Sequence, residues 1–250
     1  MSTSARHTEL RNALGVLRSR IAAAAASVNR DAAEIELLPI TKFHPASDVA
    51  ILWHLGCRGF GESREQEASA KIAEFRELTG SADLDDIRWH MVGQIQSNKA
   101  KAVAAWADTV HSVSNAKVVA ALDKACVRAL DEGRRANPLR VFVQISLDGD
   151  CARGGVDIGD PGAVDAVCSD VAESTGLELA GLMAVPPLNV EPGQAFSALA
   201  VEHRRVLRDH PTATGLSAGM SEDLEVAVRH GSTCLRVGTA LLGERPLTSP

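Results

Sequence analysis

The chain has 250 residues, 45% of them apolar and 23% charged, which is enough apolar material for the sizeable core of an α/β barrel. Its formal net charge of −6 argues against a nucleic-acid-binding protein, because phosphate backbones are bound by clustered Lys and Arg. Five cysteines without a Cys-x-x-Cys pair fit neither a disulfide framework nor a zinc site, so we expect reduced thiols and no metal.

Nothing in the sequence predicts export or membrane insertion. Arg11, Arg18 and Arg20 interrupt the apolar positions near the N-terminus, and no stretch approaches the roughly 18 apolar residues of a membrane helix. We therefore expect a cytoplasmic protein that binds neither membranes nor nucleic acid.

The first predicted element is a helix over residues 8–28, where Leu10, Leu14, Leu17 and Ile21 recur at helical spacing. Short apolar runs then alternate with helical patterns. The predicted strands are 35–41, 59–61, 89–93, 109–113, 141–145, 179–185, 214–217 and 235–238. The predicted helices between them are 46–56, 64–79, 98–106, 115–133, 160–175, 193–209 and 221–230.

Regular alternation of strand and helix indicates a parallel sheet covered by helices. The tail from Leu241 to Pro250 is too short and proline-rich for an eighth covering helix, and the helix at 8–28 can fill that place. We predict a single (β/α)8 TIM-type barrel domain over residues 1–250, with the barrel itself at 35–243. The alternative is an open doubly wound sheet, which the lack of Gly-x-Gly-x-x-Gly after the first strand weakens.

Lys42 is the clearest reactive candidate, because functional side chains of such barrels lie at the C-terminal ends of the strands. It directly follows the apolar run Pro39-Ile40-Thr41, where a desolvated amine can form an imine, although a lysine at a strand end can also simply reach solvent. The other lysines fall on or beside helical patterns, where a solvated ammonium costs nothing: Lys71, Lys99, Lys101, Lys117 and Lys124.

The loops after the seventh and eighth predicted strands are candidate phosphate-binding segments. Glycines there allow close approach of backbone N–H groups, and Ser217 and Thr239 add hydroxyl donors. The alternative for Ser221 is an ordinary helix cap. Strand parity places Arg236 opposite Leu235 and Val237, facing the barrel mouth, where an aromatic nitrogen or a carboxylate such as Glu62 could pair with it.

Four motifs now make the sequence similar to a known family. Trp89-His90-Met91-Val92-Gly93-Gln94-Ile95-Gln96-Ser97-Asn98-Lys99 resembles the most specific signature of the pyridoxal-phosphate homeostasis proteins, the YggS type related to the barrel domain of alanine racemase. The other three are Phe60-Gly61-Glu62-Ser63-Arg64-Glu65-Gln66-Glu67, Leu216-Ser217-Ala218-Gly219-Met220-Ser221 and Arg236-Val237-Gly238-Thr239-Ala240. The resemblance spans about Leu38 to Arg245.

The resemblance implies that Lys42 holds pyridoxal 5′-phosphate as a Schiff base. It also implies that Ser217, Gly238 and Thr239 hold the phosphate, that Arg236 faces the pyridine nitrogen, and that Met220 belongs to the same site. The chain departs from the family pattern at three positions: Ser63 replaces a usual asparagine, Ala218 a larger apolar residue and Gln94 a frequent histidine.

The related racemases imply a second base opposite the lysine, a tyrosine supplied by a separate β-domain. This chain contains no tyrosine, and the barrel uses its whole length. Arginine beside the pyridine nitrogen also weakens the ring as an electron sink. We therefore expect a cofactor-homeostasis protein without catalytic residues, a monomer or weak dimer whose partners are apo-enzymes that receive the cofactor.

Two enzymatic alternatives remain at this stage. One is a small racemase-type enzyme whose second base is His90, His111 or Cys234; the other is an aldolase that forms a lysine imine with a phosphorylated sugar and needs no cofactor. Lys99 and Lys101 could guide an anionic ligand toward the mouth, but two lysines at a helix start are more often only solvated.

Overall fold

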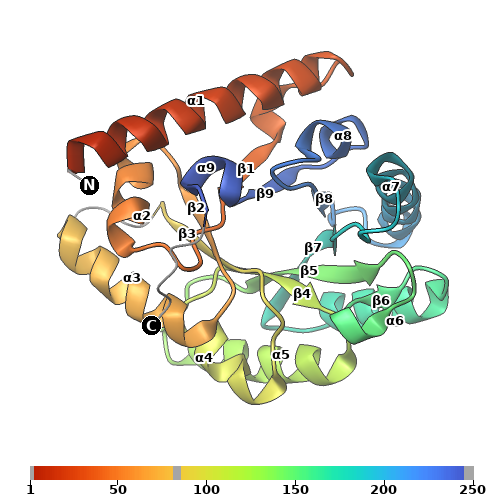
Figure 1. The fold of residues 1–250 in the computed structure, drawn as a ribbon. Helices are drawn as coiled ribbons and strands as arrows, with labels where there is room; N and C mark the ends of the chain where they lie inside the picture. The colour runs from red at the N-terminus through yellow and green to blue at the C-terminus, as the bar shows by residue number, and fades with distance from the viewer. Residues whose placement is uncertain (1–2, 81–85, 245–250) are drawn as a thin grey trace.

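The computed structural model describes residues 3–80 and 86–244, which form a ring of parallel strands surrounded by helices (Figure 1). The hydrogen-bonded strand order is β1-β9-β8-β7-β5-β4-β3-β2, with β6 (Val156–Asp157) paired to β5. The ring comprises β1 Glu36–Pro39, β2 Gly59–Glu62, β3 Arg88–Met91, β4 Thr109–Val113, β5 Leu139–Ser146, β7 Leu177–Ala184, β8 Gly215–Ser217 and β9 Cys234–Val237.

The two end strands of this order meet at a single parallel bridge. It joins Ile40 to Gly61, and the backbone N–H of Thr41 donates to Gly61 O at 2.9 Å. The sheet is therefore a nearly closed barrel. The predicted TIM-type fold is confirmed, and the open doubly wound alternative is wrong.

Side chains of the strands alternate between the helix-facing core and the barrel interior, as the pleat requires. On β9, Leu235 and Val237 pack in the large core between sheet and helices, whereas Cys234 packs with Leu38 and Ile40 of the interior. Arg236 shares the parity of Cys234, so the predicted orientation of Arg236 is correct.

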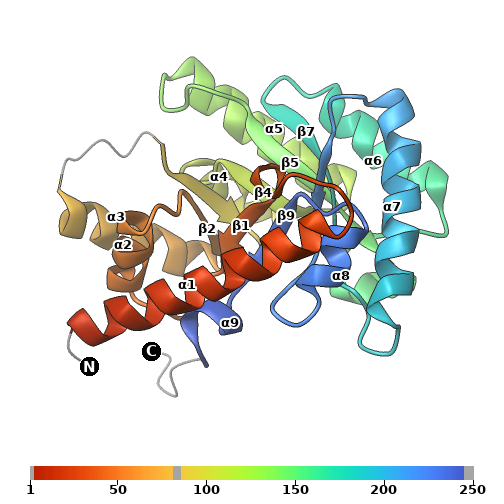
Figure 2. The same cartoon turned by 90° about the horizontal axis from the view of Figure 1, so that it is seen from above.

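The covering helices lie around the outside of the sheet (Figures 1 and 2). They are α1 Thr3–Ala26, α2 Ala46–His54, α3 Glu65–Thr79, α4 Ala100–Ala104, α5 Ala116–Asp131, α6 Pro161–Ala172, α7 Pro192–Asp209, α8 Leu224–Arg229 and α9 Thr239–Leu242. Short 3-10 turns occur at Ala32–Glu34, Ser97–Lys99 and Cys151–Arg153. No helix within residues 3–80 and 86–244 is long and apolar enough to cross a membrane.

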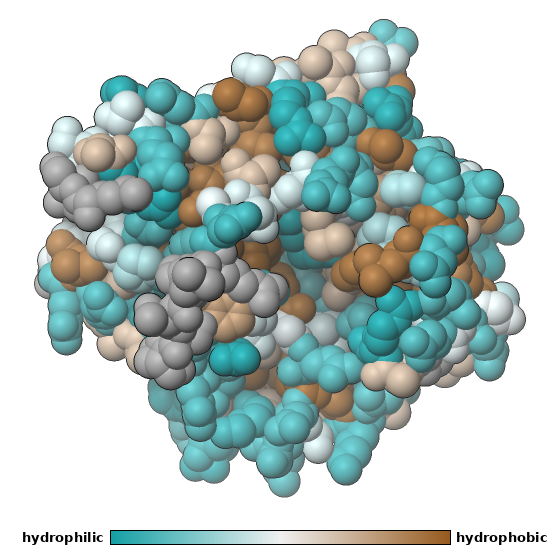
Figure 3. All heavy atoms as spheres, viewed as in Figure 1, coloured by the Kyte–Doolittle hydropathy of each residue, from teal (hydrophilic) through white to brown (hydrophobic). Residues whose placement is uncertain are grey.

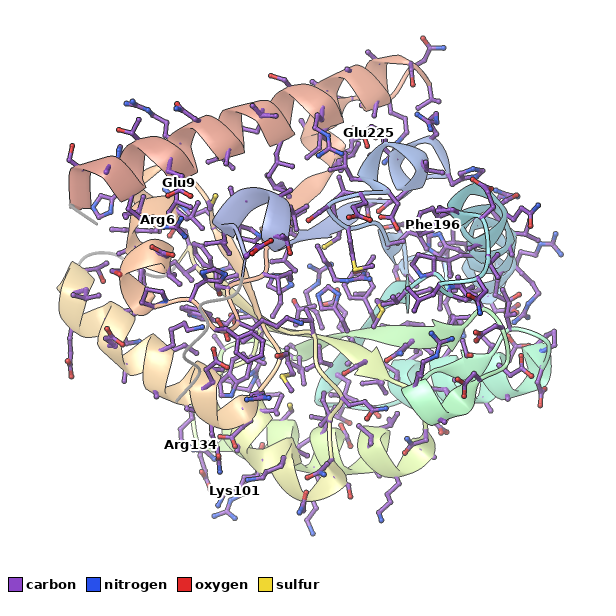
Figure 4. All side chains as sticks on the ribbon, in the orientation of Figure 1. Arg6, Glu9, Lys101, Arg134, Phe196 and Glu225 are labelled. Carbon is purple, nitrogen blue, oxygen red and sulfur yellow. The ribbon has the colours of Figure 1, made fainter. Side chains whose placement is uncertain are left out.

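Helix α1 fills the place of the missing eighth covering helix, as predicted. It contacts α2 on one side and α8 and α9 on the other, and its leucine stripe is buried in the core. Arginine side chains connect α1 to neighbouring helices near both of its ends; Figure 4 labels Arg6 and Glu225, which take part in these contacts. Arg6 forms two hydrogen bonds with Asp48 of α2, at 3.1 and 2.7 Å, and Arg20 forms two with Glu225 of α8, at 2.7 and 3.0 Å.

The C-terminal third differs from the predicted boundaries. Helix α8 begins at Leu224 rather than 221, because the side chain of Asp223 accepts a hydrogen bond from Met220 N at 2.6 Å and holds the preceding residues in a turn. A short helix, α9, follows β9 where only an irregular tail was predicted. The remainder of that predicted tail, 245–250, lies outside the described residues.

Candidate functional site

Lys42 lies just beyond β1, at the end of the barrel where the strands finish. It sits two residues past the bridge at Ile40, within the turn Thr41–His44, and is half-buried. The next residue, Phe43, has a φ of 67°, a left-handed conformation that residues with side chains rarely adopt. The prediction of a partly desolvated amine at a strand end therefore agrees with its position.

Lys71 is not the solvated helix lysine that the sequence analysis expected. Only 6% of it is exposed, and its Nζ lies 2.6 Å from Glu62 Oε1, whose residue is fully buried. Lys71 is also 3.1 Å from Glu67 Oε1, four residues earlier on α3. Because Glu62 pairs with Lys71, the suggestion that Glu62 pairs with Arg236 is wrong.

The Arg236 side chain points from β9 into the barrel interior and is 6% exposed. Its guanidinium donates to Ser217 O at 2.7 Å, Ser217 Oγ at 2.6 Å and Ala184 O at 2.9 Å. These partners, taken from the described residues, are neutral oxygens and include no carboxylate. Burial accordingly lowers the pKa of Arg236 from its ordinary value. A planar cationic donor is thus fixed in place by neutral oxygens, and the described residues place no carboxylate in hydrogen-bond contact with it.

A chain of hydrogen bonds continues from Ser217 through the barrel interior. His111 Nδ1 lies 2.9 Å from Ser217 Oγ, and His111 Nε2 lies 3.0 Å from His90 Nδ1. His90 Nε2 is 3.7 Å from Glu36 Oε1 at the opposite end of the barrel. Burial lowers the pKa of both histidines, that of His111 strongly, so both rings are neutral at pH 7.

The second bases that the racemase alternative requires lie within this interior. His90, His111 and Cys234 are 4%, 0% and 3% exposed. His111 stacks on Phe142, with ring centroids 4.6 Å apart, and burial raises the pKa of the Cys234 thiol well above its usual range. None of the three is presented to the open end of the barrel.

The predicted phosphate segments meet at the open end, where the β8–α8 loop lies beside the start of α9 (Figures 1 and 2). Gly238 precedes α9, and Thr239 begins it with an exposed side chain. Met220 is half-buried in the neighbouring loop. The structure therefore brings three of the predicted cofactor residues together.

Ser217 occupies a different position from the other predicted phosphate residues. It is fully buried, and its hydroxyl is bonded to Arg236 and His111 as described above. Ser221, for which a helix cap was the alternative, does not cap α8, whose N-cap residue is Asp223. Ser221 lies in the loop instead, and its Oγ accepts a hydrogen bond from Ala240 N at 3.2 Å.

A cavity of about 920 Å³ opens beside the Lys42 turn, between that turn, α3 and the segment after β3. Lys99 lines this cavity, with Nζ 3.7 Å from Glu65 Oε2, whereas Lys101 is exposed and points away from the barrel (Figure 4). The cavity wall also includes Ser63 and Gln94, two of the positions that depart from the family pattern.

Apolar side chains are exposed at the same end of the barrel. In Figure 3 brown spheres gather near α7 and the end of β7. In the segment that follows β7, the exposed large apolar residues are Val185, which is 44% exposed, and Leu188, which is 97% exposed; α7 itself exposes Val201.

Sequence comparisons agree with this geometry. The profile of a family described as "Alanine racemase, N-terminal domain" matches residues 14–246. The pyridoxal phosphate homeostasis protein of Mycobacterium leprae (strain TN) is 61% identical over 247 residues, which are 98% of this chain and 96% of that protein. The protein of the same name from Escherichia coli (strain K12) is 34% identical over 235 residues, covering 93% and 95% of the two chains.

Solved structures give the same result at the level of the fold. PipY of Synechococcus elongatus PCC7942, solved with PLP bound, has a TM-score of 0.73 and 31% identity, covering 89% of this chain and all of that one. Alanine racemase of Clostridium difficile 630 has a TM-score of 0.66 at 14% identity, covering 96% of this chain and 57% of that one, so it is similar in fold alone. The chain therefore belongs to the family of pyridoxal phosphate homeostasis proteins, built on the alanine racemase N-terminal fold.

Proposed function

We propose that this protein binds pyridoxal 5′-phosphate as a Schiff base on Lys42 and acts in homeostasis of that cofactor. The observation that carries the proposal is Arg236, a buried guanidinium on the strand next to the one that leads to Lys42. Its hydrogen-bond partners among the described residues are neutral oxygens of Ser217 and Ala184. Arginine remains protonated and can only donate, so it suits an aromatic nitrogen that keeps its lone pair.

The residues at the open end fit the rest of the cofactor. Lys42 supplies a half-buried amine, and when bound the cofactor supplies the aldehyde with which that amine condenses. Gly238, Thr239 and Ser221 offer backbone and hydroxyl donors to a phosphate beside the start of α9. Met220 borders the same loop. We assign the phosphate to this loop. The Ser217 hydroxyl holds Arg236, and it would donate to the phosphate only after rotating away from its contacts with Arg236 and His111.

We propose a role without amino-acid turnover. Lys42 can act as a base on one side of a substrate, but the chain has no tyrosine, and the enclosed histidines His90 and His111 cannot readily serve the other side. A reversible imine suits release of the cofactor to apo-enzymes, which we propose as recipients. The relatives' names, pyridoxal phosphate homeostasis proteins, support this choice over a racemase.

We also propose that the protein works in the cytoplasm as a monomer or weak dimer. The cysteines whose state the structure describes are free and buried: Cys57, Cys126, Cys168 and Cys234. Burial raises the pKa of Cys126 to about 11 and that of Cys168 to about 12, so these thiols stay protonated and unreactive.

Borohydride reduction tests the assignment of the imine. Protein loaded with pyridoxal phosphate is reduced, digested and mapped by mass spectrometry. We expect a phosphopyridoxyl group on Lys42 and loss of that label in Lys42→Ala. Label on Lys99 or Lys101, or no label on any peptide, would contradict the assignment. Failure to bind pyridoxal phosphate, combined with imine formation from a phosphorylated sugar, would favour the aldolase.

A further inference from the structure

The turn that carries Lys42 is hydrogen-bonded on both sides to one charged group of residues, Glu62, Glu67 and Lys71, which we call the Lys71 cluster. On the side before Lys42, Lys71 Nζ donates to Thr41 O at 2.7 Å, and Thr41 Oγ donates to Glu62 Oε1 at 2.6 Å. On the side after it, Phe43 N donates to Glu67 Oε1 at 2.5 Å. Both neighbours of Lys42 are therefore bonded to the same cluster.

Lys71 unites the cluster. Its ammonium contacts Glu62 at 2.6 Å and Glu67 at 3.1 Å, so each of the two carboxylates that bind the turn is also bound to Lys71. Glu62 is fully buried and Lys71 is 6% exposed. Burial raises the pKa of Glu62, while Lys71 and Thr41 oppose that shift. Burying charges to this extent costs free energy unless the charges are paired. The cluster therefore differs from a surface ion pair, whose charges remain in contact with water.

The conformation of the turn explains why such fixing is needed. Phe43 has a φ of 67°, which is unfavourable for any residue with a β-carbon, so an unrestrained turn would relax. The bond from Phe43 N to Glu67 and the bond from His44 N to Thr41 O at 3.0 Å oppose that relaxation. The guanidinium of Arg64 also lies over the Phe43 ring, 5.1 Å from its centroid. Any relaxation would redirect Lys42, which lies between these contacts.

We propose that Glu62, Glu67 and Lys71 are positioning residues that hold the Lys42 amine in the orientation needed for imine formation. The inference rests on the proposed Schiff base at Lys42. It assigns the cluster no contact with the cofactor, so the cluster governs imine formation and leaves recognition of the ring and phosphate unchanged.

Two ligands separate these roles: pyridoxal 5′-phosphate, which has an aldehyde, and pyridoxine 5′-phosphate, which has an alcohol in its place and cannot form the imine. In Glu67→Ala we expect affinity for pyridoxal phosphate to fall roughly tenfold, as for loss of a charge-assisted hydrogen bond, and affinity for pyridoxine phosphate to stay within about twofold. Lys71→Met should show a larger selective loss. Glu67→Gln, which keeps an oxygen acceptor for Phe43 N, should recover part of it.

Glu74→Ala is the matched control, because Glu74 lies on α3 and borders the same cavity but is exposed. It should leave both affinities unchanged. Lys71→Met leaves the buried Glu62 carboxylate without its ammonium partner and can unfold the protein. In that case the Glu67 variants are sufficient for the test, because the Glu67 side chain is 25% exposed.

Three results would overturn the inference. If a cluster variant lost affinity for both ligands equally, the cluster would support the fold and not the orientation of Lys42. If Glu67→Ala left both affinities unchanged, Glu67 would have no part in orienting Lys42. If the wild-type protein bound both ligands equally and gave no label on Lys42, the proposed function itself would fail. Because the third result is measured on the wild-type protein, it distinguishes failure of the proposed function from failure of the positioning role.

Discussion

Ser217 and Thr239 occupy different environments although both stand in the motifs that indicate phosphate binding. The Ser217 hydroxyl is buried between Arg236 and His111, whereas Thr239 begins α9 with its side chain exposed at the open end. Substitution of Ser217 by alanine should therefore act mainly by freeing the Arg236 side chain. Substitution of Thr239 should act on the phosphate directly.

We predict that Thr239→Val weakens binding of pyridoxine phosphate and pyridoxal phosphate alike. Loss of one hydrogen bond to an anion costs about 1.5–3 kcal/mol, which corresponds to a roughly 10- to 150-fold higher Kd. Calorimetric titration measures both ligands. Thr212→Val, at an exposed threonine before β8, is the control and should change neither affinity. Unchanged affinities in Thr239→Val would move the phosphate away from α9.

The buried histidines predict how stability depends on pH. Burial lowers the pKa of His90, His111 and His203 in the folded protein, while in the unfolded chain histidine titrates near 6.5. Below about pH 6.5 the unfolded state therefore binds more protons than the native state. The stabilisation is complete above that pH and is lost as pH falls, by up to about 1.4 kcal/mol per pH unit for each histidine that stays neutral.

Urea unfolding between about pH 7.5 and 5.5 measures this slope. Replacing the interior His111 by asparagine should flatten the slope, whatever its effect on absolute stability. The same change at His54, an exposed histidine of α2, should leave the slope as it is. A free energy of unfolding that stayed constant over this range would contradict the prediction that these rings are buried in the neutral form.

At the level of elements, α1 depends on the arginines at its two ends. Arg6 forms two hydrogen bonds with Asp48, whose side chain is 6% exposed, and donates to Leu242 O of α9 at 2.9 Å. The bond to Asp48 raises the pKa of Arg6, so the guanidinium stays protonated. The Arg6 side chain thus joins α1 to both α2 and α9. It holds α1 in the place of the eighth covering helix.

Arg6→Ala removes both side-chain hydrogen bonds to the mostly buried Asp48 carboxylate and leaves it beside His44, whose Nδ1 is 3.7 Å away. We predict that this change lowers the free energy of unfolding by about 1–3 kcal/mol. Arg11→Ala, at an exposed position of the same helix, should change it by less than about 0.5 kcal/mol. Chemical denaturation compares the two. Equal effects would mean that the Arg6 contacts add nothing beyond helix propensity.

For the whole molecule, the elements that the sequence predicted well are those set by hydrophobic pattern. The strand predicted at 109–113 occupies those residues, and all five of them are buried, as expected for a strand covered on both faces. The predicted helix at 221–230 starts three residues late, since the side chain of Asp223 bonds back to Met220, a choice that no periodicity reveals.

Lys71 shows the limit of reading residue types one at a time. A lysine in a helical pattern was taken as solvated, yet Lys71 shares a helix face with Ala68, Ile72 and Phe75, all of which are buried. That spacing was visible in the sequence. Its partner Glu62 lies on a different element, so only the assembled barrel identifies the ion pair.

The absence of amino-acid turnover is a prediction about the whole barrel. Lys42 stands at the open end, while His90 and His111 are buried within the barrel and Cys234 packs against Leu38 and Ile40. Among the described residues, none of these three groups therefore lies beside Lys42, and Arg236, which we propose faces the ring nitrogen, would disfavour protonation of that nitrogen. Alanine incubated with the loaded protein in deuterated water should exchange its α-hydrogen slowly or not at all, as followed by NMR. Racemisation with a kcat of about 1–10³ s⁻¹, the ordinary range of enzymes, would contradict the homeostasis role. In that case, loss of the activity in His90→Gln, His111→Asn or Cys234→Ala would identify the second base.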